Sequence, residues 1–253
     1  MTALKTALVT GAGSAEGIGF AIARKLAERR LKVAISGASE RIHQRAQELK
    51  AEGFTVTSHV ADLVKSFEVD RLGDEVGDVD ILVNNAGMGS LAAPASQGSF
   101  LTLREEDWDR GIDVSLKTAF LVTRTFLPAM TRNGRGRIIN VASVTGPLVS
   151  IEGESAYSAA KAGMVGMTHA LALEVARFGI TVNAVAPGWI ETGASLEYER
   201  AAARFTPIGR AGRPSEVAAA VNFLASEEAS YVNGILLVVD GGNVIQEQKV
   251  QMK

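Results

Sequence analysis

The sequence predicts one α/β domain over residues 1–253, in which helices cover both faces of a doubly wound, mostly parallel sheet of seven strands. Seven short runs rich in β-branched residues recur along the chain, and several are apolar throughout, as is typical of strands buried on both faces. Segments with helical periodicity separate these runs, and parallel strands need such crossover connections. The runs are Thr6–Thr10, Lys32–Ser36, Thr55–Val60, Val79–Asn84, Arg137–Ala142, Ile180–Ala186 and Ile235–Asp240.

The helical segments follow from apolar residues spaced three and four positions apart. The first helix is expected to begin near Gly17, and the long stretches Glu105–Met130 and Ser155–Phe178 are expected to be helical. The resulting three layers place a ligand crevice beyond the carboxyl ends of the strands. The apolar positions that mark the first, second and last helices are Ile18, Ala21, Ile22, Leu26, Ile42, Ala46, Leu49, Val217, Ala220, Val221 and Leu224.

Composition narrows the function classes. The hydrophobic fraction of 47% against 21% charged residues is typical of a globular fold, and a net charge of −2 argues against nucleic acid and anionic membranes as partners. The chain has no cysteine, which fits a reducing cytoplasm, and we expect neither an export signal nor a membrane span. Its three histidines lie far apart in sequence, so no metal site is expected.

Three segments interrupt the regular alternation. The stretches 89–102 and 193–213 are rich in small residues, Gly and Pro, and long loops at the rim of such a sheet usually contact the substrate. Residues 246–253 are polar and are expected to fray.

The first strand ends in a glycine-rich turn that runs from Gly11 to Gly19. Glycines allow a sharp turn and a close approach of the backbone to a pyrophosphate at the positive end of the following helix. Tight turns also use glycine for conformational reasons alone, but the position after the first strand of a βαβ unit favours a dinucleotide site. The turn lacks the Gly-Lys-Ser/Thr ending that would bind a triphosphate.

A second set of polar residues follows the fifth predicted strand. Tyr157 and Lys161 lie four positions apart and therefore on one face of a helix, and Ser143 comes just after the strand, at the rim where a ligand carbonyl would lie. A Tyr and Lys at this spacing are common by chance, so it is Ser143 that favours a catalytic interpretation.

The chain resembles the short-chain dehydrogenases/reductases of about 250 residues, from about Thr6 to Gly242. The similarity to 3-oxoacyl-[acyl-carrier-protein] reductases rests on motifs whose order and spacing together are specific. These are the glycine turn to Gly19, Asn84-Asn85-Ala86-Gly87, Ser143 with Tyr157 and Lys161, Asn183-Ala184-Val185-Ala186-Pro187-Gly188, and the closing Val239-Asp240-Gly241-Gly242.

The resemblance implies a Rossmann-like fold and an NAD(P)-dependent hydride transfer between nicotinamide and a secondary alcohol or ketone. It implies that Tyr157 is the general acid/base, that Ser143 holds the substrate oxygen, and that Lys161 binds the ribose and lowers the tyrosine pKa. The cofactor contacts that it implies are Gly11, Ser14, Gly17, Ile18, Gly19, Ser36, Ser39, Arg41, Asp62, Leu63, Asn85, Ala86, Gly87, Tyr157, Lys161, Pro187, Gly188, Ile190 and Thr192.

Two departures from the family pattern bear on activity and cofactor choice. Ser115 replaces the family's asparagine, which supports a water relay behind the lysine, so Ser115 is a candidate catalytic residue or a structural one. The glycine turn is two residues longer than usual, and Glu16 occupies a position that is often basic in NADP-dependent relatives. No acidic residue stands at Gly37, where NAD-dependent relatives present a carboxylate.

Glu16 argues against NADP(H), whereas the missing carboxylate at Gly37 argues for it, because its absence removes repulsion from a 2′-phosphate that Ser39 and Arg41 could bind. We favour NADP(H) over NAD(H) on the second argument, with a solvated Arg41 on the next helix as the alternative role for that residue. Residues 206–210 and 214–217 suggest a 3-oxoacyl thioester as substrate, although sugar and polyol dehydrogenases share these stretches. A dinucleotide-binding sensor with weakened catalysis is the other alternative, supported by Ser115 alone. The family's helix pairing predicts a homodimer or, preferably, a homotetramer.

Overall fold

The computed structural model describes residues 5–87 and 98–247. Seven parallel strands form one sheet in the order β3-β2-β1-β4-β5-β6-β7. The strands are β1 Thr6–Val9, β2 Lys32–Gly37, β3 Val56–Val60, β4 Ile81–Asn84, β5 Gly136–Val141, β6 Ile180–Pro187 and β7 Leu236–Val239. Each of them overlaps a predicted run, so the predicted fold class is confirmed.

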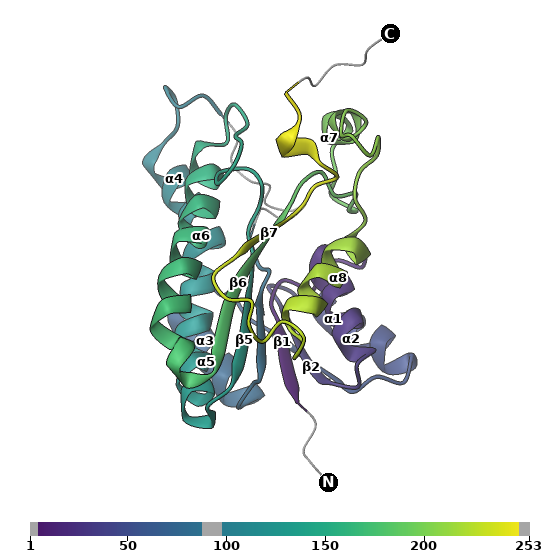
Figure 1. Cartoon of the computed structure of the whole chain (residues 1–253). Helices are drawn as coiled ribbons and strands as arrows, with labels where there is room; N and C mark the ends of the chain where they lie inside the picture. Colours follow the sequence, from purple (N-terminus) through teal and green to yellow (C-terminus); the bar gives the residue numbers. More distant parts are fainter. Residues whose placement is uncertain (1–4, 88–97, 248–253) are drawn as a thin grey trace.

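Helices cover both faces of the sheet, and Figure 1 shows α3, α5 and α6 on one side and α1, α2 and α8 on the other. The α-helices are α1 Ile18–Ala27, α2 Arg41–Ala51, α3 Ser66–Val76, α4 Glu105–Ile112, α5 Thr118–Asn133, α6 Ser155–Val175, α7 Glu197–Ala203 and α8 Pro214–Leu224. Short 3-10 turns follow at Ala176–Phe178 and Asn243–Ile245.

Two apolar cores lie between the sheet and its helical layers. Successive residues of one strand pack against opposite helical layers, because side chains alternate between the two faces of a sheet. Val9 of β1 packs in the core under α1 and α8, whereas Leu8 packs in the core under α3, α5 and α6. Both residues are completely buried, which explains why β1 reads as an apolar run instead of an alternating one.

The stretch 105–130 is helical as predicted, but it is not a regular α-helix throughout. A π-helical turn, Asp113–Lys117, separates α4 from α5. Such wide turns insert a residue into the helical ladder and often occur at functional sites. Ser115 lies buried in the middle of this turn.

The predicted polar tail begins at Gln246, near the end of the described chain. Gln246 donates hydrogen bonds from Nε2 to the carbonyl oxygen of Phe205 at 2.9 Å and to Asn243 Oδ1 at 3.1 Å. Residues 248–253 lie outside the described part, so fraying of the tail remains a prediction.

Candidate active site

The sequence-predicted site residues gather at one edge of the sheet. Parallel strands all end at the same edge, and the glycine turn, Asn85–Gly87, Ser143 and Pro187–Thr192 follow β1, β4, β5 and β6, which are neighbours in that order. The chain reverses direction across the sheet between β1 and β4, because β2 and β3 lie on one side of β1 and β4 on the other. Ligand crevices of doubly wound sheets form at such a reversal.

The glycine turn is held in shape by the segment after β4. Thr10 Oγ1 accepts the backbone N–H groups of Asn85 and Ala86, both at 3.0 Å. Asn85 Nδ2 in turn donates to the carbonyl oxygens of Thr10 and Gly11, at 3.0 and 3.1 Å. The amide nitrogen of the Asn85 side chain therefore braces the turn, a role that the sequence alone did not indicate.

Two glycines of the turn are required by close contacts. Gly11 has φ of +69°, and a Cβ there would lie 2.8 Å from Ala86 Cα. A Cβ on Gly19 would lie 2.5 Å from both Asn85 Nδ2 and the carbonyl oxygen of Gly11. A larger residue at either position would push the turn away from β4, so both glycines have a structural reason that is independent of ligand binding.

The same turn fits a dinucleotide. The N-cap of α1 is Gly17, which offers no side-chain hydrogen bond, so the first N–H groups of the helix remain free of a capping side chain. A Cβ on Gly13 would meet nothing within 4 Å, so backbone stands open to a ligand there. Ser36 Oγ, next to the turn on β2, is buried and has no hydrogen-bond partner. Free amides at a helix N-terminus match the chemistry of a pyrophosphate.

The two extra residues of the turn bring Glu16 to the opposite wall of the crevice. Glu16 Oε2 lies 2.7 Å from the position that a Cβ on Gly193 would occupy. Gly193 belongs to the segment after β6, so Glu16 links the cofactor side of the crevice to the predicted substrate loop. From the sequence, only the negative charge of Glu16 could be considered, because no sequence pattern places Gly193 close to it.

The residues expected around the adenosine end also come together. Arg41 Nε lies 3.4 Å from Ser39 Oγ, as a donor to that hydroxyl, and both follow Gly37 at the end of β2. The carbonyl oxygen of Gly37 accepts the N–H of Ala61 at 3.0 Å, which places Asp62, directly after Ala61, beside this strand end.

Asp62 is part of a charged loop that starts α3. Its carboxylate lies 3.1 Å from Lys65 Nζ and accepts the N–H of Val64 at 3.3 Å, and its own N–H donates to Glu68 Oε2. Hydrogen bonds to Asp62 and Glu68 raise the pKa of Lys65. Leu63 is buried. Asp62 thus has the turn-forming role that an acidic residue often takes here, and its contact with adenine remains a prediction.

Ser143, Tyr157 and Lys161 meet at the carboxyl end of β5. Ser143 Oγ accepts the N–H of Thr145 at 3.0 Å, which holds its side chain in place. Burial raises the pKa of Tyr157 to about 12, while a hydrogen bond with Ser143 opposes that rise and the charges of Glu154 and Glu199 add to it. The Tyr157 hydroxyl therefore keeps its proton at neutral pH, as a general acid requires.

Lys161 lies under this pair and is almost completely buried. Its Nζ donates to the carbonyl oxygen of Val141 at 2.8 Å and lies 5.7 Å from the centre of the Tyr157 ring. Burial lowers the pKa of Lys161 to about 8. The lowering of the tyrosine pKa by Lys161 remains a prediction.

Ser115 and Gly87 complete the floor of the site. A Cβ on Gly87 would lie 3.4 Å from both Lys161 Nζ and Ser115 Cα, and Gly87 has φ of +151°. The π-helical turn is therefore adjacent to the lysine, where a relay residue would have to be. The participation of Ser115 in proton transfer remains a prediction.

The segment after β6 forms the far wall and then a closed loop. The carbonyl oxygen of Pro187 accepts the N–H of Val144, and a Cβ on Gly188 would lie 2.6 Å from Asp240 Cβ, so this backbone is packed between β5 and β7. Ile190 bridges to Gly212, and the N–H of Gly212 donates to Trp189. Both ends of loop 191–211 are thereby joined at its base.

Side chains stabilise this loop from within and from its base. Thr192 N–H donates to Ser195 Oγ at 2.9 Å, and Trp189 contacts Tyr198 of α7 edge-on, with ring centroids 6.4 Å apart. Arg210 pairs through two nitrogens with Glu216, and both this pair and the N–H of Arg213 hold the pKa of Glu216 at about 2. The Arg and Glu of the sequence stretches 206–210 and 214–217 therefore lock the loop to the start of α8.

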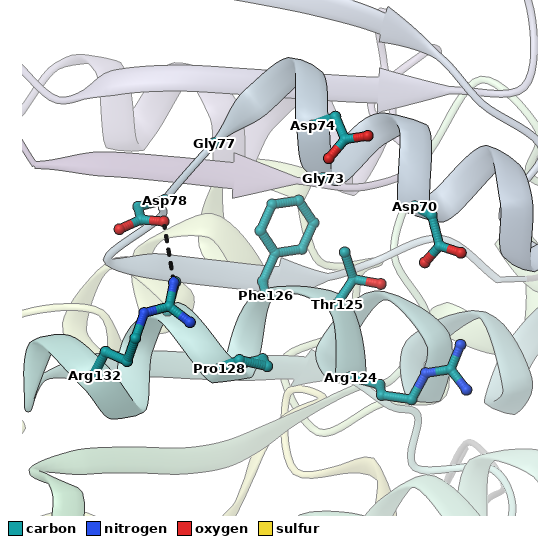
Figure 2. A pocket seen from close by; sticks show the side chains of 11 residues that line it. Asp70, Gly73, Asp74, Gly77, Asp78, Arg124, Thr125, Phe126, Pro128 and Arg132 are labelled. Carbon is teal, nitrogen blue, oxygen red and sulfur yellow. Dashed lines mark ion pairs between the residues drawn. The ribbon is translucent and has the colours of Figure 1, made fainter.

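One groove lies away from these residues. Figure 2 shows it between α3 and α5, with Arg132 facing Asp78. The groove has a volume of about 370 Å³, and the Arg132 and Asp78 side chains lie 4.0 Å apart. Its residues come from 70–78, in α3 and the turn after it, and from 124–132 of α5. The groove contains no Ser–Tyr–Lys arrangement and is separate from the candidate site.

The structural findings on metal ligands and on membrane-spanning helices cover the described residues. Within residues 5–87 and 98–247, no group of three potential metal ligands lies together. His43 contacts Ser58 and Glu40, whereas His59 contacts Glu75 and Thr57. In the same ranges, no helix has the length and hydropathy to cross a membrane.

Known proteins resemble this chain over nearly its whole length. Residues 11–243 match the family profile described as enoyl-(acyl carrier protein) reductase. The oxidoreductase UcpA of Salmonella typhimurium is 39% identical, covering 96% of this chain and 95% of that protein. The 3-oxoacyl-[acyl-carrier-protein] reductase FabG of Rickettsia prowazekii is 40% identical, with 94% and 96% covered. A solved structure described as a proposed gluconate dehydrogenase of Agrobacterium tumefaciens superposes with a TM-score of 0.86 at 33% identity, covering 95% and 96% of the two chains.

Proposed function

Because this chain belongs to the short-chain dehydrogenase/reductase family and is an NAD(P)-dependent oxidoreductase, we propose that it transfers hydride between NADP(H) and a secondary alcohol or its ketone. The observation that carries the proposal is the meeting of Ser143, protonated Tyr157 and buried Lys161 beside the glycine turn. The roles of these residues are inferred from their geometry and from the family.

In the direction of reduction, the bound nicotinamide would supply the hydride to the carbonyl carbon. Ser143 and Tyr157 hold the carbonyl oxygen, and Tyr157 donates its proton to that oxygen as the negative charge develops. Lys161 donates to the cofactor ribose and places positive charge under the tyrosine, so that the phenolate left behind is stabilised. Oxidation of the alcohol runs these proton movements in reverse.

The substrate that we favour is a 3-oxoacyl thioester, since the FabG relatives are named as 3-oxoacyl-[acyl-carrier-protein] reductases. A sugar or polyol is the second candidate, favoured by the structural similarity to the proposed gluconate dehydrogenase. The test is to measure the oxidation of NADPH and NADH with ketones, acetoacetyl thioesters and keto-sugars. If no carbonyl compound were reduced while the cofactor still bound tightly, the sensor alternative would be favoured.

The lack of cysteine supports a cytoplasmic location as part of this proposal.

The preference for NADP(H) rests on the end of β2. Gly37 offers no carboxylate, and a Cβ there would make ordinary contacts of 3.5 Å with Ile42, so an acidic side chain can start from this position without a clash. We expect Gly37→Asp to reverse the order of affinity, because its carboxylate repels a 2′-phosphate and accepts hydrogen bonds from a free ribose. Cofactor fluorescence titration measures both constants. Tighter NADH binding by the unmodified protein would contradict the preference.

The outer faces of α5 and α6 support a homodimer or homotetramer. Phe120 is 47% exposed and Leu173 is 84% exposed, and a Cβ on Gly166 would meet nothing within 4 Å. Exposed apolar side chains beside an open small-residue surface are typical of helix pairing between copies. Light scattering at micromolar concentration should give two or four times the mass of one chain, and a monomer would contradict the assembly.

A further inference from the structure

Glu16 extends from the glycine turn to the loop that follows β6. It stands directly before Gly17, the N-cap of α1, and its side chain reaches Gly193. The three atoms nearest to a Cβ placed on Gly193 all belong to Glu16, namely Oε2 at 2.7 Å, Cβ at 3.6 Å and Cδ at 3.7 Å. Both ends of the Glu16 side chain therefore lie against the backbone of residue 193.

Gly193 belongs to a tight turn that its neighbours hold in shape. The N–H of Ser195 donates to the carbonyl oxygen of Thr192 at 3.1 Å, and the N–H of Thr192 donates to Ser195 Oγ at 2.9 Å. Ser195 Oγ also donates to the carbonyl oxygen of Ile190 at 3.1 Å. The contact with Glu16 therefore joins the glycine turn to a segment whose own conformation is fixed by hydrogen bonds.

The backbone of Gly193 does not itself require glycine. Its φ lies outside the left-handed region, so an alanine would adopt the same conformation without strain. The space that a side chain would need at this position is instead taken by the Glu16 carboxylate. Glu16 and Gly193 thus form a pair in which a missing side chain on the loop leaves room for a long side chain on the turn.

The contact between Glu16 and Gly193 crosses the edge of the sheet where the predicted site lies. The glycine turn follows β1 and Gly193 follows β6, and β4 and β5 lie between these two strands. At about 4.8 Å per strand, the ends of β1 and β6 are about 14 Å apart, and the six residues 188–193 can extend over about 20 Å. Asn85–Gly87 and Ser143 follow the two strands that are crossed. The loop and Glu16 together therefore bridge the crevice between the glycine turn and Ser143.

We propose that Glu16 and Gly193 form a latch that has to open before the cofactor can enter or leave, so that Glu16 sets the rate of cofactor exchange. The inference rests on the proposed binding of NADP(H) in this crevice. The latch lies beside the N-terminus of α1, where NADP(H) and NAD(H) would both place their pyrophosphate. It should therefore slow the release of both cofactors alike and leave the choice between them to the end of β2.

The release of bound NADPH and NADH tests the latch. Each reduced cofactor is chased with an excess of its oxidised form in a stopped-flow instrument, and its fluorescence is followed. Glu16→Ala should raise both dissociation rate constants by about threefold or more, because contacts between bound partners act mainly on dissociation. Glu16→Gln keeps the length of the side chain and should not speed release. If the carboxylate acted only by repelling the pyrophosphate, Glu16→Ala would slow release, and that result would overturn the inference, as would an unchanged rate.

Gly193→Ala disturbs the latch from the other side. Its methyl group would displace the Glu16 carboxylate without straining the backbone. The substitution should speed cofactor release in the unmodified protein and have no further effect in the Glu16→Ala variant, because both changes remove the same contact. Additive effects would overturn the pairing. Glu197→Ala is the matched control, since it removes an exposed carboxylate from the same loop, and it should leave both rates unchanged.

Hydrogen exchange of the cofactor-free protein tests the latch without any turnover. Glu16→Ala should speed the exchange of backbone amides in residues 190–195, because the loop loses its contact with the glycine turn. Exchange in this segment that is as slow in Glu16→Ala as in the unmodified protein would overturn the inference. Failure of the proposed function would appear separately, as a protein that releases cofactor as described above but reduces no carbonyl compound.

Discussion

Tyr157→Phe should lower kcat for ketone reduction by at least about 10², because a general acid typically contributes about 10² to 10⁴ in rate. The substitution removes one hydroxyl from a half-buried ring and leaves its packing, so the fold and most of the cofactor affinity should remain. The pKa of Tyr157 lies at about 12, so its loss of a proton should not limit reduction by the unmodified enzyme between about pH 6 and pH 9. Initial rates and cofactor titrations measure these effects.

Tyr231→Phe provides the control, because this tyrosine is fully exposed after α8. It should reduce ketones at the unmodified rate. If Tyr157→Phe did the same, Tyr157 would not be the acid and the mechanism proposed above would be wrong.

Lys161→Ala should weaken cofactor binding and turnover together, since it removes both the ribose donor and the positive charge beneath Tyr157. It also leaves the carbonyl oxygen of Val141 without the donor that now lies 2.8 Å away, which costs about 1 to 3 kcal/mol if no water replaces it. Cofactor titration measures the loss of binding, kcat measures the loss of turnover, and urea denaturation measures the loss of stability. Lys50→Ala, at the exposed end of α2, should change none of them.

The pH dependence of stability provides a further readout for Lys161. Its pKa is about 8 in the folded chain, below the ordinary 10.5, so the unfolded chain binds this proton more tightly. The contribution of Lys161 to the free energy of unfolding therefore rises with pH between about 8 and 10.5. Lys161→Ala should remove that rise. An unchanged pH profile of urea denaturation in the variant would contradict the lowered pKa.

The sequence determined the fold class and the succession of strands and helices along the chain because those depend on local patterns. Apolar runs such as 180–186 are buried on both faces, and the alternation with helical segments requires parallel pairing. The site edge follows from the same reasoning, since residues that come directly after parallel strands must share one edge. That is why Ser143 and the glycine turn could be placed together from the sequence.

Tertiary structure decided the features that depend on contacts between distant segments. The π-helical turn at Ser115 interrupts a stretch whose composition is helical throughout, and the brace from Asn85 to the glycine turn joins residues about 75 positions apart. The same holds for the pKa of Tyr157, which burial of its hydroxyl raises and to which two glutamates contribute.

Glu199 is an example of a residue whose surroundings only the tertiary structure decided. By sequence alone it is one acidic residue in a short helix, with no pattern that relates it to Tyr157, 42 positions earlier. Folding of the loop after β6 places its charge where it raises the pKa of Tyr157. The sequence thus determined which chemical groups and which sheet edge form the site, because these follow from local periodicity and strand direction. Only the tertiary structure decided which charges face the reacting atoms, because electrostatic interaction depends on distance in space and on the exclusion of water.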